Sequence, residues 1–314
     1  MKYAVISDVH GNINALTAVL KDAEDFGADK YIFAGDYCTG LPYPNEVINA
    51  IKNLKHKIAI QGNEDNSLLE CVKQDQTTWT DGQFQTRYWC YHTLTNENCQ
   101  YLKKLPKRVD FKDNGIEITV THSSADIYGD AAHREYTSSK VAIKYQNDPD
   151  YSRDKLLKDI WEYANLSACF QSAIQSLSDG IYISGHTHVQ WYVQCGNKVL
   201  INPGSCGLPL DGASGAPYTI LDIKSNHLHV EERRASYDIN KLKLGFQNSN
   251  LFKAAPVWSG VILREMTAGF EAAQFFLQFV NDYANRINDS LRPYSIKTWT
   301  EAYNLWKQQN FGEF

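Results

Sequence analysis

Acidic, amide and imidazole side chains follow five short, β-branched apolar runs of this sequence. They are Asp8 with His10, Asp36, Asn63, His122, and His186 with His188. Side chains two apart in an extended segment point the same way, so His186 and His188 can face one point in space. One such pair is common in surface turns. Five apolar runs that all end in residues able to bind metal point instead to a shared site.

The elements expected around the first three runs alternate between strand and helix. Residues 3–7, 30–34 and 57–60 read as buried strands, and residues 13–23 and 46–54 between them carry apolar stripes at helical spacing. This α/β pattern predicts a parallel sheet with right-handed crossovers. Because ligands collect at the carboxyl ends of parallel strands, we expect all five runs to end at one edge of one sheet.

The residue types favour particular metals. Imidazole and carboxylate ligands without thiolates suit Mn, Fe, Zn, Co or Ni better than Mg or Ca. Seven ligands are too many for one catalytic ion, which keeps an open position. They suit two divalent ions about 3.5–4 Å apart that share a carboxylate and activate a water molecule. We expect manganese as the first choice among these metals.

The rest of the chain divides into further segments. Residues 64–104 read as mostly helical, and Asn114-Gly115 marks a hairpin turn that leads to His122. Residues 123–179 read as an inserted helical cap with helices over about 138–146 and 153–177. Four antiparallel strands are expected after His188, over residues 191–195, 198–202, 218–223 and 227–233. We expect a main domain over 1–238 and a helical extension over 239–314, which either packs back on that domain or makes a homo-oligomer.

The composition is that of an ordinary soluble protein. The 314 residues carry a formal net charge of -5, so no basic surplus suggests nucleic acid as a partner. The seven cysteines include no Cys-x-x-Cys pair and read as reduced thiols. No stretch approaches the roughly 20 apolar residues of a membrane span. We therefore expect a cytoplasmic protein that binds neither nucleic acid nor membrane.

The motifs resemble one known family. The run Asp8-Val9-His10-Gly11-Asn12, Gly35-Asp36, Gly62-Asn63, His122 and Gly185-His186-Thr187-His188 stand in the order and spacing of the calcineurin-like metallophosphoesterases. The resemblance covers about residues 2–238. Within the family, the sequence is similar to the small bacterial branch, which contains phosphodiesterases and diadenosine tetraphosphatases. It does not reach the C-terminal tail.

The resemblance implies a four-layer α/β/β/α sandwich of two mixed sheets with a dinuclear metal centre. By motif position, the first ion would be held by Asp8, His10, Asp36 and His188, and the second by Asp36, Asn63, His122 and His186. Asp36 would bridge the ions, and Asp36, Asn63 and His122 would be the catalytic residues.

This sequence departs from the family at its general acid. Where the family usually has a His after Gly-Asn, this chain has Glu64, and the acid that supports that His is replaced by Thr39. Glu64 is thus a candidate replacement acid, or a carboxylate that stabilises a helix N-terminus. Without a proton donor, substrates with good leaving groups are favoured.

We therefore expect a phosphoesterase in which a metal-bridging hydroxide attacks phosphodiester bonds, and also phosphomonoester bonds, of small nucleotide-like substrates. The alternatives are a protein or dinucleoside-polyphosphate phosphatase and a non-catalytic scaffold of the same fold. Asn12, His133 and Arg134 are candidate substrate contacts.

Overall fold

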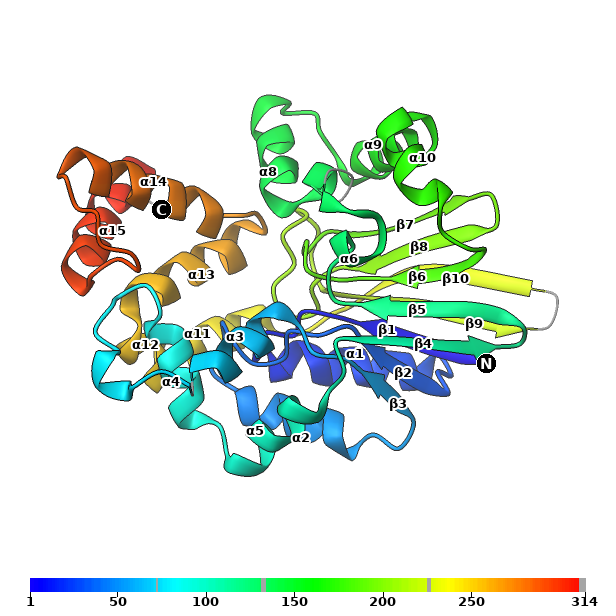
Figure 1. The fold of residues 1–314 in the computed structure, drawn as a ribbon, viewed down its shortest axis with the longest axis horizontal. Helices are drawn as coiled ribbons and strands as arrows, with labels where there is room; N and C mark the ends of the chain where they lie inside the picture. The colour runs from blue at the N-terminus through cyan, green and yellow to red at the C-terminus, as the bar shows by residue number, and fades with distance from the viewer. Residues whose placement is uncertain (72, 131–133, 225–226, 311–314) are drawn as a thin grey trace.

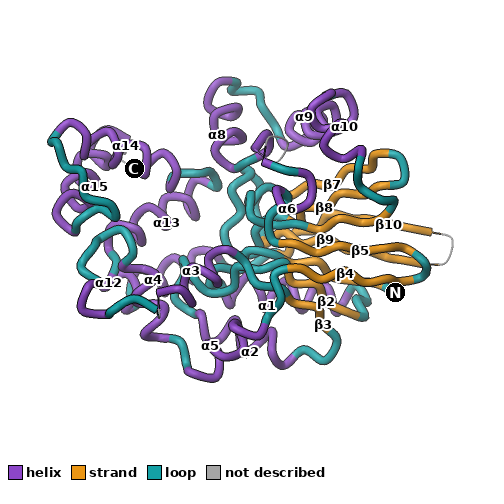
Figure 2. Tube along the Cα trace, viewed as in Figure 1, coloured by secondary structure: helices purple, strands orange, loops and turns teal. Residues whose placement is uncertain are grey.

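Two stacked five-stranded sheets form the centre of the protein in a computed structural model, which describes residues 1–71, 73–130, 134–224 and 227–310 (Figures 1 and 2). The first sheet has the order β10–β9–β1–β2–β3, and the second has the order β4–β5–β6–β8–β7. The strands of the first sheet are β1 (Lys2–Ile6), β2 (Lys30–Phe33), β3 (Lys57–Ala59), β9 (Ala216–Lys224) and β10 (His227–Ala235). Those of the second are β4 (Arg108–Asp113), β5 (Ile116–Thr121), β6 (Gly180–Ile183), β7 (Gln190–Cys195) and β8 (Lys198–Pro203).

Strand β1 shows how the sequence builds the layers. Its side chains alternate, so Tyr3 and Val5 pack between the two sheets while Ala4 and Ile6 face the outer helices. Strand β1 pairs in parallel with β2, and β2 with β3, as the alternation of strands and helices predicts. The parallel arrangement brings the carboxyl ends of these three strands together.

Helices cover the outer face of each sheet and complete the four-layer sandwich (Figure 2). On the first sheet they are α1 (Ile13–Asp25), α2 (Pro44–Asn53), α3 (Asn63–Cys71), α4 (Gln85–Thr93) and α5 (Asn96–Lys104), with the short 3-10 helix η1 (Gln76–Thr78) between α3 and α4. Asn12 caps α1, as expected, because its side chain accepts a hydrogen bond from the Ala15 amide.

The inserted helices differ from a simple cap. They are α6 (Ala125–Tyr128), η2 (Arg134–Tyr136), α8 (Ser138–Asn147), α9 (Arg153–Leu166) and α10 (Ala168–Gln175). Helices α9 and α10 pack on the outer face of the second sheet (Figure 1). The single helix expected over 153–177 is interrupted at Ser167, whose extended backbone ends α9 and whose hydroxyl caps α10.

The second sheet confirms one expectation and corrects another. The hairpin around Asn114-Gly115 is present, because β4 and β5 pair antiparallel. Strand β8, however, pairs antiparallel with β7 but parallel with β6. A short apolar strand with two neighbours has the same pattern in either direction, so the sequence could not distinguish these pairings.

The C-terminal extension packs back on the rest of the chain, which is one of the two expected alternatives. Its helices are α11 (Ile239–Gln247), α12 (Asn250–Ala254), α13 (Pro256–Ala268), α14 (Ala273–Arg286) and α15 (Ile296–Asn310). Trp299 and Phe276 form their own core, and a second core joins Ile262 and Met266 to Leu41 and Leu208. Figure 1 shows α13–α15 beside the strand ends rather than over a sheet face. In the described residues, no helix is long and apolar enough to cross a membrane.

Candidate metal centre

The seven candidate ligands come together, but from two sheets rather than one. Asp8, Asp36 and Asn63 follow β1, β2 and β3 of the first sheet, whereas His122 follows β5 and His186 follows β6 of the second. The expectation of a single sheet edge is therefore wrong. Apolar runs look alike in one sheet or two, and the site lies where the carboxyl ends of both sheets meet.

Two groups of side chains have the geometry to hold a cation. Asp8, His10 and His188 form one group, and Asp36, His122 and His186 form the other; in each, the potential ligand atoms lie within 4.8 Å of one another. Asp8 Oδ1 is buried and has no hydrogen-bond partner in the described chain, although Nε2 atoms lie 3.4 Å (His188), 3.8 Å (His10) and 4.0 Å (His122) away. A buried carboxylate oxygen with no hydrogen bond suits a metal ligand.

Backbone carbonyls fix the tautomers of three of these imidazoles. Nδ1 of His10 donates to Thr39 O (2.7 Å), Nδ1 of His122 to Ala34 O (2.6 Å) and Nδ1 of His188 to Leu208 O (2.9 Å). A carbonyl only accepts, so in the neutral rings the lone pair lies on Nε2. This is the arrangement in which a metal-binding histidine donates its other nitrogen to a carbonyl.

The resulting contacts require a positive charge. Nε2 of His10 lies 3.1 Å from Nε2 of His188, and Nε2 of His122 lies 2.8 Å from Asn63 Oδ1. Each contact pairs two acceptors unless a proton or a metal ion lies between them. The donor set therefore fits the two divalent ions expected in this family.

The pKa values of the candidate ligands also show that the site favours positive charge. Burial disfavours a charged imidazole, but the nearby carboxylates outweigh it: Asp8 and Asp36 raise the pKa of His10 to about 9 and that of His122 to about 10. Burial also opposes ionisation of Asp8, yet His10 and His188 hold the pKa of that carboxyl well below its usual value. The cluster is thus built to stabilise positive charge.

The ligand-bearing backbone is strained. Asp8, His10, Asp36, His186 and His188 all have positive φ, between 50° and 72°. This region costs a non-glycine residue about 1–3 kcal/mol and persists where the surrounding structure enforces it. Such a concentration of left-handed residues is typical of functional sites.

Close packing leaves room only for glycine beside the ligands. A Cβ on Gly62 would lie 2.1 Å from Asp36 Oδ1, and one on Gly185 would lie 1.9 Å from Ser7 Oγ and 2.4 Å from Asp8 Oδ2. The Gly-Asn and Gly-His pairs of the sequence therefore have a steric reason.

Asp65 supports the site, and the sequence assigned it no role. Its buried carboxylate accepts hydrogen bonds from the amides of Asp36 (2.9 Å), Tyr37 (3.0 Å) and Gly62 (3.0 Å). It therefore ties the loop after β2 to the loop after β3. Burial and then the charge of Asp36 raise the pKa of Asp65 to about 6. The sequence feature that could have indicated this role is the position of Asp65, two residues after the candidate ligand Asn63.

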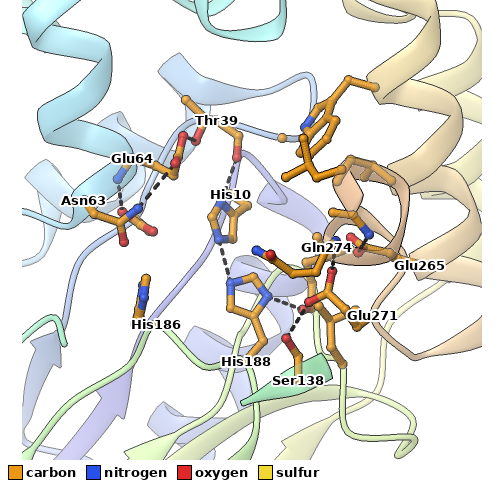
Figure 3. A pocket seen from close by; sticks show the side chains of 18 of the residues that line it. His10, Thr39, Asn63, Glu64, Ser138, His186, His188, Glu265, Glu271 and Gln274 are labelled. Carbon is orange, nitrogen blue, oxygen red and sulfur yellow. Dashed lines mark hydrogen bonds between the residues drawn. The ribbon is translucent and has the colours of Figure 1, made fainter. Parts of the chain in front are cut away.

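Glu64 lies among three polar partners. It accepts hydrogen bonds from Asn63 Nδ2 and Thr39 Oγ1, each at 3.3 Å, and pairs with Arg87 at 3.5 Å. The two positions at which the chain departs from its family are thus in direct contact. Figure 3 shows Asn63 and Glu64 side by side. With its Nδ2 bonded to Glu64, Asn63 presents its amide oxygen to His122 Nε2, 2.8 Å away.

The candidate substrate contacts are placed differently. The amide of Asn12 is fully buried, caps α1 and donates to Gly207 O (2.9 Å), so Asn12 is not placed to reach a substrate and that expectation is wrong. Arg134 begins η2, and His133 lies outside the described residues.

Five of the seven candidate ligands line a cavity of about 670 Å³; they are His10, Asp36, Asn63, His186 and His188. One side is formed by the ligand loops and α4, including Thr39, Glu64 and Arg87. The other side is formed by the start of α8 and by helices α13 and α14 with their connection; Glu265 comes from α13 and Glu271 from the connection (Figure 3). This second side was not predicted, because its residues carry no motif.

The chain belongs to the calcineurin-like phosphoesterase superfamily, whose domain matches residues 1–226. By family it is a metal-dependent phosphoesterase, and the two groups of candidate ligands agree with that class.

The chain is also similar to several individual proteins. An uncharacterised protein of Methanocaldococcus jannaschii is 28% identical over 253 residues, which are 76% of this chain and 88% of the relative. The fold is similar to that of a metallophosphoesterase from Sphaerobacter thermophilus (24% identity, TM-score 0.59) and of a hypothetical protein from Pyrococcus horikoshii (20% identity, TM-score 0.59). Each match covers 86% of this chain and 99% of the other.

Proposed function

We propose that the protein uses two divalent metal ions to hydrolyse phosphodiester bonds of small, nucleotide-like substrates, with phosphomonoesters as secondary substrates. Asp8, His10, Asp36 and His188 would hold one ion. Asp36, Asn63, His122 and His186 would hold the other, and manganese is the metal we expect.

One observation carries this proposal. The Nδ1 atoms of His10, His122 and His188 bond to backbone carbonyls, so the Nε2 atoms, which carry the lone pair in the neutral rings, converge on the carboxylates of Asp8 and Asp36 beside a cavity of about 670 Å³. That volume lies within the usual range for small-molecule sites. A large macromolecular substrate is not required to fill it.

The division of labour follows from the residues. Bound divalent ions supply Lewis acidity toward the phosphate and a water of lowered pKa. The chain orients the ligands through Thr39 O, Ala34 O, Leu208 O and the Asp65 carboxylate. The replacement of the family's general-acid His by Glu64 favours substrates whose leaving group needs little protonation.

The test is hydrolysis of bis-p-nitrophenyl phosphate by the full chain with and without manganese. We expect metal-dependent release of p-nitrophenol, chelator-sensitive and restored by manganese, together with close to two bound ions per chain. His122→Ala should abolish the activity while circular dichroism stays unchanged; His92→Ala, a histidine outside the cavity, is the matched control. Equal activity in His122→Ala and the parent would refute the site.

The alternative, a protein or dinucleoside-polyphosphate phosphatase, predicts a different substrate ranking. Comparing p-nitrophenyl phosphate, a phosphopeptide and a dinucleoside tetraphosphate with the diester separates the two. A metal content below one ion per chain at neutral pH would favour the non-catalytic scaffold.

A further inference from the structure

The side of the cavity formed by the C-terminal extension lies outside residues 1–226, which match the family domain. Its residues come mainly from α13 and the start of α14. They include Trp258, Ile262, Glu265, Glu271, Gln274 and Leu277. In the view of Figure 3, Glu271 and Gln274 lie on the far side of His10 and His188 from Asn63 and Glu64. This wall, which we call the helical wall, therefore flanks the metal centre from the side opposite Glu64.

Two buried acids form the polar centre of the helical wall. Glu265 is 1% exposed and its Oε1 accepts hydrogen bonds from the amides of Ala272 and Ala273, each at 2.8 Å. Glu271 is 8% exposed; it accepts from Ser138 Oγ (2.5 Å) and from the Gln274 amide (2.8 Å). Burial and then the charge of Glu271 raise the pKa of Glu265 well above its usual value. The two carboxyl groups therefore lie close enough for Glu271 to oppose the ionisation of Glu265.

The Glu271 carboxyl group forms no ion pair with a described side chain. Lys140 and Arg87, which also line the cavity, pair with Glu135 (2.6 Å) and Glu64 (3.5 Å) respectively. The polar neighbours of Glu271 are the Ser138 hydroxyl, the Gln274 amide and the Glu265 carboxyl group, and none of them is a cation. A buried carboxylate without a cation is costly, so a donor supplied by a ligand would be stabilising.

We propose that the helical wall is the subsite for the alcohol portion of the phosphate ester, and that Glu271 selects an alcohol bearing a hydrogen-bond donor, an ammonium or hydroxyl group. The inference rests on the proposed function and narrows its substrate class. An acidic group with no cation beside it also disfavours a further phosphate at this position, because a carboxylate and a phosphate would repel each other in a site of low dielectric constant. The subsite thus argues against polyphosphate substrates.

The test uses four diesters that all release p-nitrophenol, so that the reacting bond is constant. The second substituent is ethyl, 2-hydroxyethyl, 2-aminoethyl or 2-phosphoethyl. Because the 2-hydroxyl group can itself attack phosphorus and expel p-nitrophenol, the cyclic ethylene phosphate formed from the hydroxyethyl diester is followed by ³¹P NMR and its share is subtracted from the rate. With the manganese-loaded full chain, we expect kcat/KM for the aminoethyl or hydroxyethyl diester to exceed that for the ethyl diester at least tenfold. The phosphoethyl diester should fall below the ethyl diester. Whether the aminoethyl or the hydroxyethyl diester is hydrolysed faster distinguishes an ammonium ligand from a hydroxyl ligand.

The decisive variant is Glu271→Gln, which keeps an oxygen for the Gln274 amide but removes the charge. We expect the ratio of kcat/KM between the aminoethyl or hydroxyethyl diester and the ethyl diester to fall at least tenfold. Glu271→Asp, which retains the charge but withdraws it by one methylene, should lower the ratio at least threefold and covers the case in which Glu271→Gln does not fold. Asp282→Asn, which changes an exposed acid in α14, the helix that follows Glu271, is the matched control and should leave all four rates unchanged.

A binding measurement supplies a readout that does not depend on turnover. O-phosphoethanolamine should raise the melting temperature more than ethyl phosphate does, and Glu271→Gln should remove that difference. If the parent hydrolyses all four diesters with equal kcat/KM, or if Glu271→Gln keeps the parent's ratio, the inference is overturned and the proposed function stands. If the parent hydrolyses none of them with manganese, the proposed function fails as well.

Discussion

The two walls of the cavity are built on different principles. The metal wall consists of short loops after five strands, with left-handed backbone at five of the seven candidate ligands and glycines packed against the carboxylates. The helical wall consists of ordinary right-handed helices whose acids accept hydrogen bonds from the amides at the start of α14. The metal wall has strained backbone and residue types that suit metal binding, whereas the helical wall has unstrained helices and contributes none of the seven candidate ligands. This contrast suggests that the first wall sets the reaction and the second sets the substrate.

The largest effect expected is in the metal wall, from Asp36→Asn. Asp36 is 2% exposed and lies 3.2 Å from His122 Nε2, so an amide there removes the charge that both proposed ions would share. We expect kcat/KM for bis-p-nitrophenyl phosphate to fall on the order of 10³-fold or more, as for other removals of transition-state stabilisation. Steady-state rates and metal analysis measure this. Less than a tenfold loss would mean that the metal wall does not carry the chemistry.

A smaller effect is expected from Asp65→Asn, which touches no proposed metal but positions the loops that do. The new amide NH₂ would face backbone N–H groups that now donate to the carboxylate. We expect manganese affinity to weaken by about 10–100-fold, the usual cost of losing such a supporting contact. Titration calorimetry with manganese measures it, and thermal melting shows whether the chain remains folded. Unchanged affinity would assign Asp65 to stability alone.

Glu64→Gln tests the edge of the metal wall that faces the substrate. If Glu64 mainly orients Asn63, we expect about a tenfold loss or less, of the same size for aryl and alkyl leaving groups. A general acid would instead cost about 10²–10⁴-fold with alkyl leaving groups and much less with aryl ones. Comparing methyl p-nitrophenyl phosphate with a dialkyl phosphate gives the answer, and an alkyl-specific loss would reinstate Glu64 as the acid.

The smallest effect is expected in the helical wall, from Glu265→Gln, and it concerns stability. Because the folded pKa of Glu265 is raised, the folded state binds more protons than the unfolded state above about pH 4.5, so stability falls as the pH rises from there toward the folded pKa. Glutamine imitates the protonated acid and removes this loss. We expect Glu265→Gln to be more stable than the parent by about 1 kcal/mol at pH 8, with a smaller difference at pH 4.5.

Urea unfolding at the two pH values measures this difference, and manganese affinity should be unchanged. An equal difference between the two proteins at both pH values would mean that Glu265 is ionised in the folded chain.

The metal wall was largely predictable from the sequence and the helical wall was not. Asp8, His10 and Asp36 are recognisable because local features mark them: an apolar run, a strand end and a neighbouring glycine. Glu265 and Glu271 resemble surface acids at a helix boundary, and their role depends on a contact with Ser138, 133 residues away. No local pattern encodes such a contact.

The errors have similar causes. Assigning all ligands to one sheet failed because Ile181–Ile183 has the same apolar pattern whether it extends the first sheet or belongs to a second. Asn12 was considered both as a helix cap and as a substrate contact, and only its burial decides between them. The parallel core, the hairpin at Asn114-Gly115 and the helical tail followed from periodicity and turn chemistry alone.

The connection between α13 and α14 has a mechanical consequence. Its Gly269 carbonyl accepts the amide of Gly212, and Phe270 forms a bridge with Asp211. Asp211 and Gly212 belong to a loop that also holds His188. In that loop the Leu210 amide donates to the His188 carbonyl, and the Leu208 carbonyl accepts from Nδ1 of the His188 ring. The C-terminal extension therefore stabilises the loop that orients the His188 ring. Cutting the chain before α13 would remove these contacts, so we expect the orientation of the His188 ring to depend on residues that follow the family domain, which ends at residue 226.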